Sequence, residues 1–465
     1  MQNILLVDFG STFTKLCAVD LEKQDIIGTS KSFSTVEQDI RDGFENALDE
    51  LYIKLGKKIT FDQMIACSSA AGGLKMAAIG LVPELTVEAS KRTCMGAGAK
   101  VDLVFSYKLT QEDINIIKNN NIDIILLSGG TDGGNTEMVQ HNIEVLGNAK
   151  LTIPIIYAGN KALDSYAEEI FSKNGIEYYI TENVMSKLNI LNMKGAKETI
   201  HQIFLKRIVS AKGINKIERK MGKVILPTPE AVLRACDLLS HGLLDEPGIG
   251  ELILVDVGGA TTDVYSMTFG YPTRIDVMMK GLTEPYQKRT VEGDLGVRYS
   301  AEGAFKQVDE ETLLALKQKG IDLKTEARKR FLNPEFVPKT ELDYLVDKAL
   351  AESCVEASVK RHAGKLEPYY TSLGMVYYQT GKSLLRVTSI IGTGGPIINS
   401  SYQKEILMKA SSTYQDIFDL RPKNASYYID SDYILYAMGL LSTINPLLAL
   451  KIMKKRIKLI TDDTK

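Results

Sequence analysis

The same pattern of apolar and polar positions occurs in two distant parts of the chain. In each copy, four apolar residues precede an Asp-x-Gly turn, a Thr stands six positions after the Asp, and a second apolar run follows. The first copy comprises 4–7, Asp8, Gly10, Thr14 and 16–19, and the second comprises 252–255, Asp256, Gly258, Thr262 and 264–267. Apolar runs flanking a glycine-containing turn predict a strand, a tight turn and a strand. The chain is therefore expected to contain two matched β-hairpins.

The turns of these hairpins have the residues that a phosphate site needs. A glycine turn lets backbone N–H groups converge on an anion, small hydroxyl residues add donors, and Lys15 adds a compact positive charge. The candidate phosphate contacts are Gly10, Ser11, Thr12, Thr14 and Lys15 in the first turn, and Gly258, Gly259, Ala260, Thr261 and Thr262 in the second. Mg²⁺ is commonly held by one or two carboxylates, which makes Asp8 and Asp256 the candidate metal ligands. One such hairpin alone is as readily an ordinary turn, but two matched copies favour the phosphate interpretation.

A third element follows both hairpins. A β-branched run at 387–391 precedes Gly392, Thr393, Gly394, Gly395 and Pro396. A glycine-rich loop after a strand lets the backbone lie against a ligand. We therefore treat residues 392–395 as a candidate nucleotide-binding loop.

Between the first hairpin and residue 220, expected strands and helices alternate. Strands are predicted at 63–67, 122–127, 151–157 and 176–180, with helices ending near Leu146 and Lys173. Such alternation predicts a parallel α/β unit. Its glycine-rich loops at 68–73 and 128–135 have two interpretations that stay open: a second ligand or partner site, or tight turns in which Asp132 and Asn135 cap helices.

The three elements, in this order, resemble the actin, Hsp70 and sugar-kinase superfamily. The resemblance implies an α/β protein with two ribonuclease H-like ATPase domains around a nucleotide cleft, with ATP and Mg²⁺ as cofactors. It implies that residues 392–395 bind adenosine and that two helices cross at a hinge, near 229–235 and 434–441, where Ala437 and Gly439 permit close approach. The expected domains are 1–250 with an inserted α/β subdomain at about 60–220, then 251–433, and then a hinge helix and tail at 434–465.

The residues in and between these motifs more closely resemble the MutL/GlmL family. Members of that family are encoded beside adenosylcobalamin-dependent glutamate mutases and related aminomutases. The stretches that carry the resemblance are 67–76, 128–135, 256–263 and 292–296. It implies an ATP-binding accessory or reactivating chaperone of such a mutase, with weak or partner-stimulated ATPase activity. A small-molecule kinase of the same fold and a non-catalytic scaffold or filament former are the alternatives.

Three carboxylates have roles that stay open. The resemblance makes Glu230, in Thr228-Pro229-Glu230, the candidate that orients the attacking water, and the alternative is that it stabilises the start of a helix. Glu292 and Asp294 are candidates for binding ribose hydroxyls, whereas the alternative for Asp294 is a helix cap.

The composition of the chain limits its expected partners and cellular location. The net charge of −2 gives no field that would recruit nucleic acid or acidic lipid. The five cysteines form no C-x-x-C pair, so a reducing, cytoplasmic location is expected. The four histidines are too dispersed for a recognisable zinc motif. The apolar segment 434–453 contains Asn445, Pro446 and Lys451 and is interpreted as a buried helix rather than a membrane span. A homo-oligomer stays an open expectation.

Overall fold

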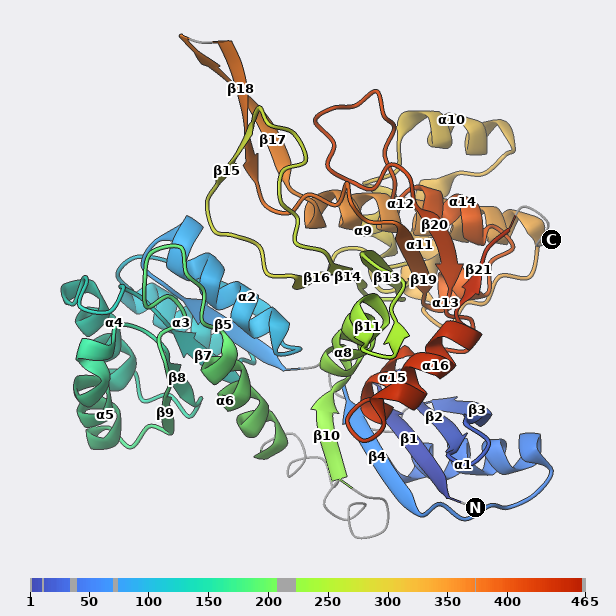
Figure 1. Cartoon of the computed structure of the whole chain (residues 1–465), viewed down its shortest axis with the longest axis horizontal. Helices are drawn as coiled ribbons and strands as arrows, with labels where there is room; N and C mark the ends of the chain where they lie inside the picture. The colour runs from blue at the N-terminus through green and yellow to red at the C-terminus, as the bar shows by residue number, and fades with distance from the viewer. Residues whose placement is uncertain are drawn as a thin grey trace. The chain divides into compact units, whose positions relative to one another are not determined.

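The computed structural model of the chain describes residues 2–10, 12–33, 40–69, 74–206, 223–372 and 374–461 (Figure 1). Two compact units emerge from the contacts within the chain. Unit 1 comprises Met1–Val232, Gly281–Thr283 and Gly439–Ile444, and unit 2 comprises Leu233–Lys280, Glu284–Met438 and Asn445–Lys465.

The first sheet of unit 1 carries the N-terminal hairpin. Its strand order is β10-β4-β1-β2-β3, where β1 pairs antiparallel with β2 and parallel with β4. The strands are β1 (Asn3–Phe9), β2 (Phe13–Asp20), β3 (Asp25–Phe33), β4 (Gln63–Ser68) and β10 (Lys223–Pro227). Helix α1 (Ile40–Leu55) buries Phe44, Ala47 and Leu51, and its Ala47 carbonyl accepts a 2.6 Å hydrogen bond from Ser30 of β3. The helix therefore covers one face of this sheet.

The second sheet of unit 1 is wholly parallel, with the order β6-β5-β7-β8-β9, as the alternating pattern predicts. Its strands are β5 (Lys75–Ile79), β6 (Lys100–Phe105), β7 (Ile124–Leu127), β8 (Ile155–Tyr157) and β9 (Tyr178–Ile180). Its helices are α2 (Glu88–Gly96), α3 (Gln111–Asn119), α4 (Glu137–Asn148), α5 (Asp164–Lys173) and α6 (Lys194–Phe204). Figure 1 shows these helices around the sheet.

Both faces of this parallel sheet are buried. Ile125 and Leu127 of β7 pack in one apolar cluster with α3, α4 and α5, whereas Ile124 and Leu126 pack in another with α2 and α6. Successive side chains of a strand point to opposite faces, so a continuous apolar run fits a strand covered on both sides.

One strand lies in a different sheet from the one that sequence spacing suggested. β4 was expected to open the α/β series, but it pairs with β1 in the first sheet. The parallel sheet instead begins at β5, which together with β6 was not predicted. A strand's partner depends on long-range register, which its local apolar pattern does not encode.

The main sheet of unit 2 has the order β16-β14-β13-β19-β20-β21. Its strands are β13 (Leu252–Val257), β14 (Thr262–Met267), β16 (Gln287–Glu292), β19 (Ser389–Thr393), β20 (Ser426–Ile429) and β21 (Lys458–Leu459). Its helices are α9 (Ala301–Phe305), α10 (Glu310–Gln318), α11 (Leu323–Leu332), α12 (Glu341–His362), α13 (Gly395–Ile398), α14 (Gln403–Met408) and α16 (Pro446–Arg456). The long helix α12 starts with a capping box between Thr340 and Asp343 and buries one side against the sheet.

Unit 2 also contains two smaller sheets. β15 (Val277–Lys280), β18 (Gly374–Thr380) and β17 (Lys365–Thr371) form a three-stranded sheet, and β11 (Gly242–Leu243) pairs with β12 (Glu246–Pro247). Figure 1 shows β17 and β18 as a long hairpin.

The first sheet of unit 1 and the main sheet of unit 2 share one topology. Strands β1, β2, β3, β4 and β10 correspond in order and direction to β13, β14, β16, β19 and β20: the first three are antiparallel neighbours, and the last two run parallel to the first. This is the ribonuclease H-like arrangement, and its presence in both units confirms the expected fold class.

The boundary between the units falls inside the two helices that were predicted to lie at a hinge. Helix α8 (Thr228–His241) passes from unit 1 to unit 2 after Val232, and α15 (Leu435–Leu441) passes from unit 2 to unit 1 after Met438. Within unit 1, Gly439 packs directly on the Ala231 backbone, so a methyl group on Gly439 would lie 2.9 Å from the Ala231 Cα. The predicted close approach at Gly439 is confirmed.

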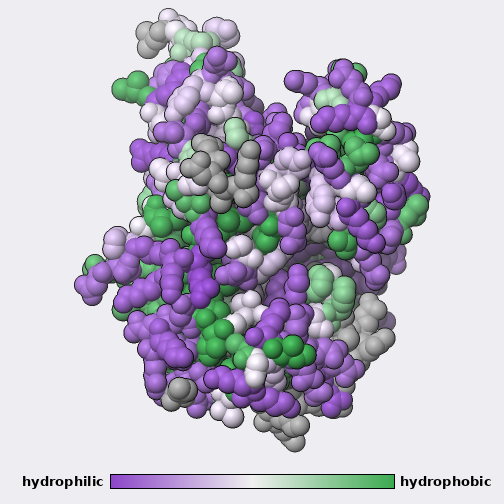
Figure 2. Space-filling view, turned by 90° about the vertical axis from the view of Figure 1, so that its right-hand side faces the viewer, coloured by the Kyte–Doolittle hydropathy of each residue, from purple (hydrophilic) through white to green (hydrophobic). Residues whose placement is uncertain are grey.

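Hydrophilic residues predominate on the face of the molecule in Figure 2, with smaller hydrophobic patches among them. Among the described residues, every helix is too short or too polar to cross a bilayer. The segment 434–453 forms α15 and the start of α16, which are separated at Asn445, whose side chain accepts a hydrogen bond from the Leu448 amide.

Candidate functional site

The first hairpin turns tightly between β1 and β2. The Gly10 amide donates to the Phe13 carbonyl at 3.1 Å, and a Cβ on Gly10 would stand 2.5 Å from that oxygen. Glycine is therefore required by close backbone approach. Thr12 is exposed in the turn, and the predicted contact Ser11 lies outside the described residues.

Asp8 lies at the carboxyl end of β1 and is 1% exposed. One carboxylate oxygen accepts a 2.6 Å hydrogen bond from the Thr228 hydroxyl, and the other lies 3.3 Å from Lys15 Nζ. The Cys67 thiol is 3.7 Å from the first oxygen, and burial, followed by the Asp8 charge, raises the pKa of that thiol. Asp8 is thus a buried carboxylate that is stabilised from three sides.

Thr228 and Cys67 were missed as site residues. Thr228 lies directly before Pro229 and Glu230, so the motif that suggested Glu230 also contained this signal. Cys67 is the register partner of Asp8 across β4 and β1, and only strand pairing reveals it.

The second hairpin repeats the first with one change of charge. The Gly258 amide donates to the Thr261 carbonyl at 2.9 Å, and Asp256 pairs in register with Asp263, where Asp8 pairs with Lys15. Arg289 of β16 lies 2.7 Å from Asp263 and compensates its charge. Asp256 is half-buried, so it is more accessible than Asp8.

Hydrogen bonds from residues 297–300 hold the loop of the second hairpin in place. The amides of Val297 and Arg298 donate to the carbonyls of Gly258 and Gly259 at 3.1 and 2.8 Å, and the Ser300 hydroxyl donates to the Ala260 carbonyl at 2.6 Å. The Thr262 hydroxyl donates to the Leu295 carbonyl. These bonds fix the loop but direct the Thr262 hydroxyl into the protein.

The glycine-rich loop after β19 lies against this hairpin. Thr393 is the register partner of Asp256, and Gly394 has φ of +94°. A Cβ on Gly394 would stand 2.7 Å from Asp256 Oδ1, so this glycine is required by both its backbone conformation and close approach. The structure therefore brings together two elements that lie far apart in the sequence, Asp256 and residues 392–395.

Two buried hydroxyls lie in the strands that border these loops, Thr14 in β2 and Thr393 in β19. Thr14 is fully buried and Thr393 is 5% exposed, and neither side-chain oxygen has a hydrogen-bond partner among the described residues. Buried hydroxyls in native proteins are nearly always paired, so such groups call for an explanation. One lies in each predicted half-site.

Glu292 and Asp294 share one cation. Arg361 of α12 contacts Glu292 at 2.6 Å and Asp294 at 2.8 Å, and this hydrogen bonding lowers the pKa of Asp294. Glu292 is also the register partner of Thr262, which places the pair beside the second hairpin. The cap interpretation of Asp294 is wrong, because α9 begins at Ala301 after Ser300.

Glu230 lies in the first turn of α8. Its carboxylate is 3.3 Å from His201 Nδ1, and both side chains are mostly buried. The pairing ties the candidate water-orienting residue to α6 of the parallel α/β sheet, a link that no sequence motif indicated.

The loops of the parallel sheet are joined by internal hydrogen bonds. Asn135 accepts from the Met138 amide near the start of α4, whereas Asp132 accepts from the Lys161 amide and from Asn183. Asn160, which is fully buried, accepts from the amides of Gly133 and Ala162. Asn135 thus binds a first-turn amide of α4 from the position before the N-cap residue Thr136, while Asp132 stabilises the turn before α5.

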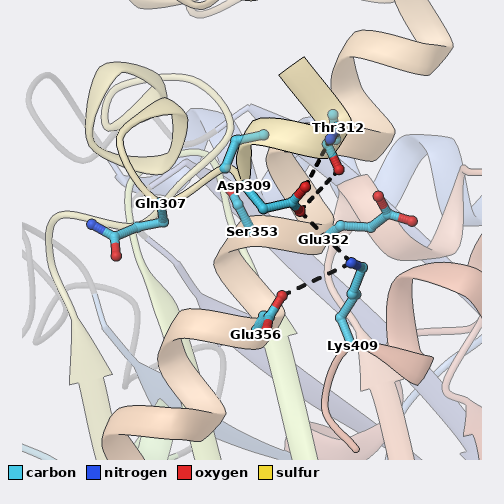
Figure 3. A pocket seen from close by; sticks show the side chains of 9 residues that line it. Gln307, Asp309, Thr312, Glu352, Ser353, Glu356 and Lys409 are labelled. Atoms are coloured by element: carbon cyan, nitrogen blue, oxygen red, sulfur yellow. Dashed lines mark hydrogen bonds and ion pairs between the residues drawn. The ribbon is translucent and has the colours of Figure 1, made fainter. Parts of the chain in front are cut away.

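A small polar hollow in unit 2, lined by residues of α10 and α12 and by Lys409, contains none of the predicted site residues (Figure 3). Lys409 lies 3.9 Å from both Asp309 and Glu356, and Asp309 also accepts from the Thr312 amide at the start of α10. Lys409 and these carboxylates in the hollow thus compensate one another's charge, so we assign the hollow no ligand.

The fold and these sites define a protein of the actin and Hsp70 type, in which two ribonuclease H-like units each have an aspartate hairpin. The chain belongs to the MutL family: the family model described as MutL protein matches residues 4–457. It is similar to Protein MutL of Clostridium tetanomorphum, with 48% identity over 98% of this chain and 99% of that one.

Two solved structures show weaker similarity. Component A of (R)-2-hydroxyglutaryl-CoA dehydratase from Acidaminococcus fermentans is 10% identical over 98% of this chain and 99% of its own, with a TM-score of 0.29. A diol dehydratase-reactivating factor in nucleotide-free form is 8% identical over 95% of this chain and 99% of its own, with a TM-score of 0.37. At these values the similarities carry no functional argument.

Proposed function

We propose that the protein binds ATP with Mg²⁺ and acts as an ATP-dependent accessory, reactivating chaperone of an adenosylcobalamin-dependent mutase. The observation that carries the nucleotide part is the repeat: two sheets of equal topology each place an aspartate and a glycine turn at the end of the first strand. Membership of the MutL family supports the proposed partner, because the resemblance to that family implies a glutamate mutase or a related aminomutase.

Each unit contributes its own residues to the proposed nucleotide binding. In unit 2, Asp256 and the loop at 392–395 supply a carboxylate and an open backbone for the metal-bound phosphates and the adenosine. In unit 1, Asp8 with Lys15 supplies the second carboxylate and a cation for the phosphates. Mg²⁺ would be held by Asp8 and Asp256 and would neutralise phosphate charge. Glu230 would orient the attacking water.

Calorimetry with magnesium and ATP tests the site. Asp8→Ala and Asp256→Ala should each weaken binding at least about tenfold, since each removes a charged ligand worth roughly 1.4 kcal/mol or more. Asp245→Ala, an exposed aspartate in the turn between β11 and β12, is the control and should bind as wild type. Undiminished affinity in both site variants would refute the two-carboxylate proposal.

Measurements of phosphate release distinguish the proposed chaperone from a kinase and from a scaffold. Release that the mutase stimulates supports the chaperone, a phosphorylated product from a panel of sugars and acids supports a kinase, and binding without turnover supports a scaffold. A pull-down with each candidate aminomutase identifies which enzyme is served.

A further inference from the structure

Tyr433 has a backbone conformation that tyrosine rarely adopts. Its φ is +54°, in the left-handed region, and it lies between β20 and the start of α15. A bulky residue is held there only when its surroundings stabilise it, and such positions cluster at ligand sites and switch regions.

The side chain of Tyr433 reaches the glycine-rich loop. A Cβ on Gly395 would stand 3.5 Å from the Tyr433 hydroxyl. Burial raises the pKa of this phenol, and the carboxylates of Asp256 and Asp430 raise it further. A tyrosine hydroxyl is protonated at neutral pH even without this shift, so the Tyr433 hydroxyl is able to donate a hydrogen bond next to the glycine-rich loop.

Asp430 joins the same loop to α15. Its amide donates to the Gly392 carbonyl at 3.0 Å, and its carboxylate accepts from the amides of Ile434 and Leu435 at 3.0 and 3.2 Å. Asp430 is 2% exposed. The loop, the Tyr433 turn and the first amides of α15 thus form one hydrogen-bonded assembly in unit 2.

We propose that Tyr433 is a nucleotide-binding residue that also transmits occupancy of the glycine-rich loop to α15. Its hydroxyl would donate to an oxygen of the nucleotide that the proposed function assigns to Asp256 and the loop at 392–395. The ligand thereby stabilises the left-handed turn, and with it the start of α15. This inference rests on the proposed function, because it needs a nucleotide in that half-site.

Tyr433→Phe tests the contact, because it keeps the ring and removes the hydroxyl. The dissociation constant for ATP with magnesium should rise about tenfold to a hundredfold, as for loss of a hydrogen bond to a charged group. Tyr428→Phe in β20, also half-buried, is the matched control and should bind as wild type. Tyr433→Asn tolerates the left-handed backbone without the ring and should show the same loss.

Hydrogen exchange tests the transmission. In wild type, ATP with magnesium should slow exchange of the amides at 434–441, and saturating nucleotide should not do so in Tyr433→Phe. Wild-type affinity in Tyr433→Phe, or equal protection in both proteins, would overturn the inference while the proposed function stands. Failure of the wild type itself to bind would instead overturn the proposed function.

Discussion

Gly439→Ala directly perturbs the crossing of α15 on α8. The added methyl carbon would lie 2.9 Å from the Ala231 Cα and closer still to the Ala231 carbonyl group, whereas non-bonded carbons approach to about 3.5–4.0 Å. Because the carbonyl group lies closer than the Cα, the two helices must separate by more than about 1 Å. Backbone cannot rotate away as a flexible side chain can, so the cost should reach the upper end for overpacking, about 3 kcal/mol. The better helix propensity of alanine returns up to about 1 kcal/mol, which leaves a net loss of about 2 kcal/mol.

Calorimetric unfolding measures this loss. In a unit of this size 1 kcal/mol corresponds to about 2–4 °C, so the transition that includes unit 1 should fall by about 4–8 °C. Gly56→Ala is the control, because Gly56 has φ of +66° with open space around its Cβ position and should cost only about 1 kcal/mol through backbone strain. A Gly439→Ala protein as stable as wild type, or one less affected than Gly56→Ala, would refute the close crossing.

Two further predictions concern pH and turnover. His362 is fully buried between Ser266 and Thr290, and burial, then Lys288 and Lys382, lowers its pKa well below 6.5. As pH falls, the unfolded chain therefore binds a proton at His362 before the folded protein does. The free energy of unfolding of the wild type, measured by urea unfolding from pH 7 to 5.5, should fall by about 1.4 kcal/mol per pH unit below about pH 6.5. His362→Gln should lack that part of the slope and His241→Gln should keep it; equal slopes in wild type and His362→Gln would contradict this account. Glu230→Gln should lower phosphate release about a hundredfold with unchanged ATP affinity if Glu230 orients water; a loss of only about 0.3–1 kcal/mol of stability, with normal turnover, would instead support the helix-dipole interpretation.

Local features of the fold could be predicted because their causes are local. A glycine turn between apolar runs forms a hairpin wherever it lies, and this held for both aspartate turns. Strand–helix alternation likewise predicted the parallel sheet. The close helix crossing at Gly439 was instead implied by the resemblance to the actin and Hsp70 superfamily.

Features that depend on strand order could not be predicted from spacing. β4 joined β1 rather than the parallel sheet, and this pairing placed Cys67 beside Asp8. Arg361, 67 residues from Asp294 in sequence, reaches its carboxylate only because α12 packs next to β16. A site residue far along the chain therefore has no signal in the local sequence around its partner.

The motifs of the sequence identified the family. The sequence by itself also determined the two hairpins, the glycine-rich turn after β19 and the parallel α/β region. Their causes are turn geometry and the period of apolar residues, which act over a few residues. Only the tertiary structure decided that Thr228 bonds to Asp8, that Asp256 lies against Gly394 and that Tyr433 reaches Gly395. Those contacts arise because sheet register and helix packing bring together groups that are separate in the chain.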